Sequence, residues 1–173
     1  MSNATSTPTG RLDQRFSIPD LPPTPWADVE AVLADQEMAW LSTVRRNGRP
    51  HVTPLVFVHA EGRLFVHSGE GEQKMVNLDG DGRCVLTVGQ PDFGSGLDVV
   101  VEGSAQRRTA RPTLELFARA MADKYGDPWV YRLDDEGLDD GQGNRPVVLE
   151  IVPTKVLAFG KGDRSGQTTF RIG

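Results

Sequence analysis

The stretch Leu64-Phe65-Val66-His67-Ser68-Gly69-Glu70-Gly71-Glu72-Gln73-Lys74-Met75-Val76-Asn77-Leu78 decides how this chain is interpreted. It begins as a short apolar strand, passes through two glycines and enters a helical turn that carries Gln73, Lys74 and Asn77. Backbone amides at a strand-to-helix turn, with an ammonium group one turn into the helix, suit a phosphate. The stretch predicts an anion-binding turn; an exposed helix lysine with no ligand is the alternative.

The residues before this stretch predict a β-hairpin. Strands are expected at 38–45 and 51–59, because Asn47-Gly48 favours a two-residue turn in which both residues take positive φ. That turn pairs Val44 with His51 and Leu41 with Pro54. Proline has no amide hydrogen, so Pro54 marks a sheet edge or a gap between strands, where a flat ligand fits.

The rest of the chain adds strands, two short helices and one long helix. Helices are expected at 25–36, 72–79 and from 109 to 125, the last with an apolar stripe of Leu114, Phe117, Ala118, Met121 and Tyr125 before Gly126. Further strands are expected at 83–89, 97–108, 147–153 and 155–160. Strands joined mostly as hairpins predict a mainly β (α+β) fold, a six- to seven-stranded β-barrel with helical covers. Residues 1–24 are expected to form a flexible proline-rich tail, and 25–173 the single domain.

Composition narrows the class of protein. The 173 residues are 38% hydrophobic and 25% charged, as in an ordinary soluble domain. The net charge of −5 argues against binding duplex nucleic acid. No apolar run approaches the roughly 20 residues of a membrane span, and the first residues lack a signal-peptide pattern. The single cysteine, Cys84, lies in an apolar run and is expected to be a small buried residue, so a cytoplasmic location is expected.

Catalytic motifs are missing from the sequence. There is no Gly-x-Ser-x-Gly elbow, no phosphate loop ending in Gly-Lys-Ser/Thr and no spacing typical of a metal site. The acidic segment 127–145 lacks the ligand order of a calcium loop and is expected to be solvated. We therefore expect no catalytic side chain and no metal; if the protein is an enzyme, a cofactor supplies the chemistry.

Three segments together are similar to a known superfamily. Ala39-Trp40-Leu41-Ser42-Thr43-Val44, Asn47-Gly48-Arg49-Pro50-His51-Val52-Thr53-Pro54-Leu55 and the lysine-bearing turn resemble the pyridoxamine-phosphate-oxidase-like split β-barrel superfamily. More narrowly, they resemble its flavin- and deazaflavin-dependent oxidoreductases, which include users of coenzyme F420. The resemblance covers about 26–172 and implies a homodimer with a cofactor site at each interface.

The resemblance also implies which residues bind the cofactor. Thr53, Pro54 and Leu55 would lie along the isoalloxazine or deazaflavin ring. The phosphate and ribityl chain would be held by His67, Ser68, Gln73, Lys74 and Asn77, although Ser68 as a turn former and Asn77 as a turn-fixing residue remain alternatives. Lys161, Gln167 and Thr168 match a C-terminal segment that reaches the partner's site in relatives. This chain departs from their Gln-Thr-Arg-Trp pattern at Thr169-Phe170.

Two further matches bear on function. Trp129 matches an aromatic position of relatives, and either borders the pocket or covers the barrel end. The end of the chain, Arg171-Ile172-Gly173, does not match the Arg-Leu-x-Pro-like segment of true pyridoxamine-phosphate oxidases, which disfavours vitamin B6 oxidation.

The expected function is that of an oxidoreductase. It would bind F420 or FMN and transfer hydride to or from a small organic substrate. A non-catalytic flavin or haem carrier is the first alternative, and a structural dimer with a decayed site is the second.

Overall fold

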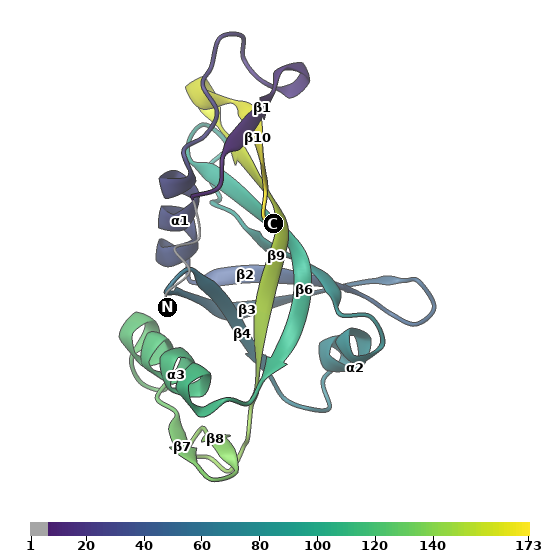
Figure 1. Cartoon of the computed structure of the whole chain (residues 1–173), viewed down its shortest axis with the longest axis vertical. Coiled ribbons are helices and arrows are strands. Elements are labelled where there is room, and N and C mark those ends of the chain that lie inside the picture. Colours follow the sequence, from purple (N-terminus) through teal and green to yellow (C-terminus); the bar gives the residue numbers. More distant parts are fainter. Residues whose placement is uncertain (1–6) are drawn as a thin grey trace.

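The computed structural model describes residues 7–173 and is built around a closed six-stranded β-barrel (Figure 1). Strands β9, β4, β3, β2, β5 and β6 pair in that order, and β6 pairs again with β9 to close the barrel. The elements are β1 (Gly10–Asp13), η1 (Gln14–Phe16), α1 (Trp26–Asp35), β2 (Met38–Val44), β3 (Pro50–Ala60), β4 (Arg63–Ser68), α2 (Gln73–Gly80), β5 (Arg83–Val88), β6 (Leu97–Arg108), α3 (Arg111–Tyr125), β7 (Arg132–Asp134), β8 (Gly137–Asp139), β9 (Val147–Gly160), η2 (Gly162–Arg164) and β10 (Gly166–Arg171). The expected mainly β barrel with helical covers is confirmed.

Strand β9 links the barrel to a second, smaller part of the sheet. Its first half pairs with β4 and its second half with β10, while β6 runs along the whole of its other side. The expectation of two strands, 147–153 and 155–160, is wrong, because a bulge opposite Glu102 and Gly103 lets one strand continue through this point. Gly103 is required there: a Cβ atom would lie 2.2 Å from the carbonyl oxygen of Val152.

Two apolar clusters hold the fold together. One fills the barrel and includes Leu41, Phe57 and Val66. The other lies between α3 and the outside of the barrel, where the predicted stripe of α3 packs on Phe65 and Val58. Neighbouring residues of β4 face opposite sides, as a strand requires. Burial of Cys84 in the barrel core is also confirmed.

The β2–β3 hairpin differs from the predicted one in its register. Gly48 takes a φ of +81°, whereas Asn47 does not take positive φ. Gly48 donates its backbone N–H to the carbonyl of Arg45, and Arg45 donates to the carbonyl of Arg49, so the loop has three residues and a bulge at Gly48. Val44 therefore pairs with Pro50 rather than His51, and Pro54 pairs with Trp40 rather than Leu41.

The structure also differs from the expectation at both ends and in the acidic segment. Residues 10–16 are not a loose tail: β1 pairs with β10, and η1 follows it. The polar end of the chain forms η2 and β10. Part of the acidic segment forms the short β7–β8 hairpin, and Arg145 pairs there with Asp134 and Glu136. β1 is not visible in local sequence patterns, because its pairing partner β10 lies at the other end of the chain.

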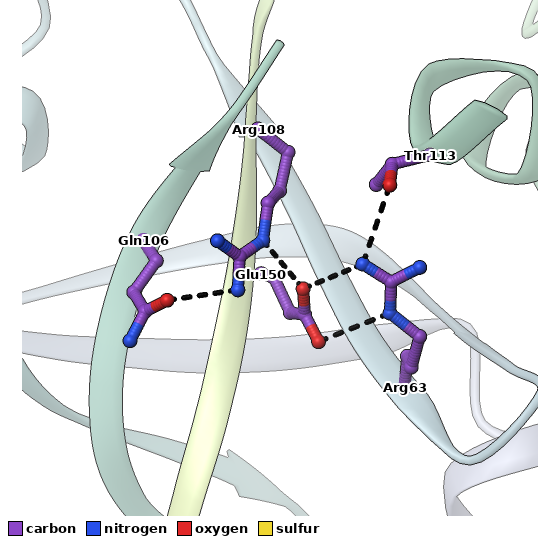
Figure 2. Close-up of polar contacts among 5 residues, drawn as sticks. All are labelled: Arg63, Gln106, Arg108, Thr113 and Glu150. Carbon is purple, nitrogen blue, oxygen red and sulfur yellow. Dashed lines mark hydrogen bonds and ion pairs between the residues drawn. The ribbon is translucent and has the colours of Figure 1, made fainter. Parts of the chain in front are cut away.

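A carboxylate between two arginines ties α3 to the sheet (Figure 2). Glu150 of β9 accepts hydrogen bonds from Arg63 at 3.1 and 2.7 Å and from Arg108 at 2.6 Å, and Arg63 also donates to Thr113 of α3. Burial alone would raise the pKa of Glu150, but the bonds from Arg63 and Arg108 outweigh it and lower the pKa. This cluster links β4, β6, β9 and α3.

In the part of the chain that the structure describes, no helix combines the length and the apolar character needed to cross a membrane.

Candidate functional site

A pocket of about 890 Å³ lies where the predicted turn meets the barrel. Leu55 and Val56 of β3 and Met38 of β2 form its apolar side, and His67 and Lys74 come from the strand and helix of the predicted turn. The segment 128–131 and the loop 140–146 form the opposite side. Figure 1 shows why these segments lie close to the turn: β7 and β8 lie below α3, at the same end of the barrel as the end of β4.

His67 lies among three aromatic rings on one side of this pocket. Its ring centroid is 5.8 Å from that of Phe117, 5.7 Å from that of Trp129 and 5.7 Å from that of Tyr131. Its Nε2 is 3.3 Å from the hydroxyl oxygen of Tyr131. Burial lowers the pKa of His67, and the positive charge of Lys74 lowers it further. The imidazole is therefore neutral at neutral pH and serves as a polar member of an aromatic wall.

The anion-binding end of the pocket is formed by the turn between β4 and α2. Lys74 is 5% exposed, and its ammonium group forms an ion pair with Glu72. The same Glu72 carboxylate accepts from the hydroxyl of Ser68 at 3.0 Å and from the backbone N–H of Gly69 at 2.8 Å. Of the donors predicted for a phosphate, Ser68, Lys74 and a backbone amide of the turn converge, and they converge on a carboxylate of the protein itself.

Gln73 and Asn77 belong to a hydrogen-bonded chain beside the pocket. Arg45 donates to Gln73 at 2.8 Å, Gln73 donates to Asn77 at 2.8 Å, and Asn77 donates to the hydroxyl of Thr43 at 2.9 Å. Asn77 is 3% exposed. These contacts fasten α2 to β2 and place Lys74; neither amide lines the pocket.

Thr53 and Pro54 lie on β3 beside the pocket rather than in its lining. The two residues face opposite sides of the strand. The Thr53 hydroxyl is buried and has no hydrogen-bond partner among residues 7–173. Pro54 is exposed on the outer face of the barrel, next to Trp40. Of the three predicted ring contacts, only Leu55 lines the pocket of this single chain.

The three C-terminal candidates lie at the other end of the molecule, near β10 at the top of Figure 1. Lys161 donates to the carbonyls of Gln90 and Asp92 at 2.6 and 3.0 Å and pairs with Asp98 at 2.7 Å. Thr168 is fully buried, and its hydroxyl accepts from the backbone N–H of Thr24 at 2.9 Å. Gln167 pairs with Phe159 in the sheet. Within one chain these residues are not brought to the pocket.

One half of the pocket has space for the ring of a flavin-type group, and the Glu72 carboxylate occupies the other half. The apolar residues of β2 and β3 face Trp129 and Tyr131 across a space large enough for a flat ring. At the other end, Ser68, Gly69 and Lys74 suit a phosphate, but a phosphate can use all three only after the Glu72 carboxylate moves. The donor set fits the group with that one displacement.

Sequence reasoning missed several residues of this site. Glu72 was not expected to act at the turn, although its spacing of two from Lys74 was visible in the sequence. Tyr131 and the loop 140–146 were missed as well, because only the folding of β7–β8 over the barrel end brings them to β4. The aromatic spacing Tyr125, Trp129, Tyr131 was the one available signal.

The fold defines the protein as a split β-barrel of the kind expected from the sequence. Residues 26–159 match the family model described as pyridoxamine 5′-phosphate oxidase. The chain therefore belongs to the pyridoxamine 5′-phosphate oxidase-like family.

Three solved structures of similar fold each share less than a fifth of their residues with this chain. A conserved hypothetical protein of Mycobacterium tuberculosis is 19% identical, with a TM-score of 0.66 over 87% of this chain and 89% of that one. The FAD binding protein of Mycobacterium smegmatis is 15% identical, with a TM-score of 0.57 over 76% and 92%. A heme binding protein of the same organism is 18% identical, with a TM-score of 0.60 over 86% and 59%. No curated protein sequence matches the chain.

Proposed function

We propose that this protein is an oxidoreductase that binds a flavin-type cofactor, F420 or FMN, and transfers hydride to or from a small organic substrate. The observation that carries the proposal is one pocket that combines an aromatic and apolar space with Gly69 and Lys74, in a chain of this family. The Ser68 hydroxyl lies behind Glu72 at the same end. The FAD binding protein of similar fold supports a flavin-type ligand.

The roles of the chain's own residues follow from their positions. Leu55, Val56 and Met38 would exclude water from one face of the ring, and Trp129 would border it at the edge. Lys74 would hold the anionic end. A bound flavin or deazaflavin supplies the hydride chemistry. Holding the ring and substrate in contact then supplies most of the rate, so no side chain is needed as acid, base or nucleophile.

The proposal includes a homodimer with the pocket at its interface. Met38 lines the pocket and also begins an exposed apolar face on the outside of β2, β3 and β5. On that face Trp40 pairs with Pro54 and with Thr87, and Trp40 and Val52 are 43% and 54% exposed. A second copy packed on this face would bury it and close the open side of the pocket. In such a dimer, as the resemblance implies, Pro54 and the partner's C-terminal segment would approach the cofactor.

A non-catalytic carrier of flavin or haem is the second candidate. It is favoured by the heme binding protein of similar fold and by the pairing of Lys74 with Glu72, which leaves the Lys74 charge neutralised at this end of the pocket. Such a protein would bind its ligand and leave the ligand's redox state unchanged.

One experiment separates these candidates. Apo protein is titrated with FMN, with F420 and with haem, followed by fluorescence quenching or absorbance, and each complex is then mixed with its reductant and candidate electron acceptors. Saturable binding of FMN or F420 with turnover supports the oxidoreductase. Tight binding without turnover supports the carrier, and no binding of any of the three overturns both.

A further inference from the structure

Glu72 occupies the place in the pocket where an anionic ligand would be held. One of its carboxylate oxygens accepts from Ser68 Oγ at 3.0 Å and from the Gly69 N–H at 2.8 Å, and the other forms the ion pair with Lys74. A hydroxyl, a backbone amide and an ammonium group aimed at one point are the donors that recognise a phosphate oxygen. The protein has therefore supplied its own anion to this donor set.

The carboxylate is ionised in this position. Burial alone would raise the pKa of Glu72, but its hydrogen bonds with Lys74, the Gly69 amide and Ser68 outweigh burial and lower the pKa below its ordinary value of 4.5. The charges of Glu72 and Lys74 cancel, so the pocket offers no net positive charge at this end. A phosphate arriving here gains the donors only by exchanging places with another anion.

The two members of the pair differ in their freedom to move. The Lys74 side chain is 7% exposed, whereas that of Glu72 is 51% exposed. Lys74 is thus held in the wall of the pocket, while Glu72 has solvent on one side and can turn outward without burying its charge elsewhere. The geometry permits the exchange and identifies Glu72 as the moving part.

We propose that Glu72 is a specificity-determining residue, an internal anion that competes with the phosphate group of the pocket's ligand. Exchange of one anion for another yields little net affinity, and the displaced carboxylate stays close enough to repel the phosphate. The wild-type pocket therefore gains little from a terminal phosphate and discriminates weakly between a phosphorylated ligand and its dephosphorylated form. For flavins this rests on the proposed function; for inorganic phosphate it does not.

The test compares wild type, Glu72→Gln and Glu115→Gln. Glutamine keeps the shape and the hydrogen-bonding oxygen of Glu72 and removes its charge. Glu115→Gln removes the same charge away from the pocket, from a side chain paired with Arg111 on the surface of α3. Affinities for FMN and for riboflavin, which lacks the phosphate, are measured by fluorescence quenching, and affinity for inorganic phosphate by calorimetry.

We expect Glu72→Gln to bind FMN and inorganic phosphate roughly tenfold more tightly than wild type, as a freed charge-assisted contact provides. Riboflavin affinity should stay the same, and Glu115→Gln should match wild type for all three ligands. Glu72→Ala, checked for folding by circular dichroism, should behave as Glu72→Gln does.

The measurements distinguish failure of the role proposed for Glu72 from failure of flavin binding. If FMN and riboflavin bind but their affinity ratio is the same in wild type and Glu72→Gln, the role of Glu72 is overturned and the proposed function stands. If no flavin binds any variant, flavin binding is overturned, and the phosphate measurement alone decides the role of Glu72: tighter phosphate binding by Glu72→Gln supports it and equal binding refutes it.

Discussion

Lys74 is the residue on which the binding end of the pocket depends. Its ammonium group is buried, next to one carboxylate and close to a neutral imidazole. Whatever anion binds here must interact with this charge. Its partner Glu72 and its neighbour His67 then set how strongly the anion is held.

Replacement of Lys74 by alanine is expected to weaken FMN binding and leave riboflavin binding unchanged. Wild type gains little from the phosphate, because Glu72 competes for Lys74. The loss therefore comes chiefly from the repulsion between the phosphate and the unpaired Glu72 that remains, and it should be roughly tenfold in affinity. Fluorescence titration measures both ligands. Lys155→Ala, which removes a lysine paired with Glu102 on β6, is the control and should bind as wild type does.

His67 makes the stability of the fold depend on pH. Burial lowers its pKa in the folded state below the ordinary 6.5, so the unfolded chain binds the proton more readily. The contribution of His67 to the free energy of unfolding is therefore fully present above pH 6.5. It falls as the pH drops below 6.5, by at most about 1.4 kcal/mol per pH unit for one group. Urea unfolding of wild type between pH 8 and pH 5 should show this decline.

The variant His67→Gln should lose stability less steeply with falling pH. Some slope remains, because burial lowers the pKa of His59 as well. Identical slopes for wild type and variant would mean that His67 does not control the acid response.

At the scale of elements, the bulge in β9 lets one strand serve both the barrel and the β10 extension. It depends on the close approach of β6 at Gly103, where the carbonyl of Val152 occupies the place of a side chain. A residue with a Cβ atom has to push the two strands apart.

Gly103→Ala is therefore expected to destabilise the fold by about 1–3 kcal/mol, as overpacking in a well-packed site does. Gly80→Ala is the matched control: its Cβ would meet nothing within 4 Å, at the last residue of α2. Chemical denaturation should show a lower midpoint for Gly103→Ala alone. Equal midpoints for both variants would show that the strands separate here without strain.

For the whole molecule, the exposed face of β2, β3 and β5 is the feature that a single chain does not explain. Met38, Trp40, Val44 and Val52 are each more than two-fifths exposed on adjacent strands. Soluble monomers rarely leave a contiguous apolar area of this kind in water.

Wild type is expected to be a dimer at micromolar concentration, and Trp40→Asp a monomer with weakened cofactor binding. Stable dimer interfaces often bury roughly 2,000 Å² or more in total, and a charge at the centre of one is not tolerated. Light scattering gives the mass of each variant. Phe16→Asp, which changes an exposed aromatic residue on η1, should remain dimeric. A monomeric wild type would refute the two-subunit pocket.

The sequence by itself determined the strands of the barrel, the three α-helices and the turn between β4 and α2, because each rests on local periodicity and local turn chemistry. The alternation in β4, the stripe on α3 and the position of Lys74 after two glycines all lie within short stretches. The predicted register of the β2–β3 hairpin is shifted by one residue from the observed one, because the register depends on whether one or both turn residues take positive φ.

Only the tertiary structure decided what surrounds Lys74. Glu72 turning back onto Ser68 and Gly69, and Tyr131 folding over His67, are contacts whose geometry depends on the turn and on packing between distant segments. Lys161 and Thr168 look in the sequence like candidates for the same pocket, yet the sheet places them at its other end. Side-chain types reveal which chemistry is available, and packing selects which groups meet.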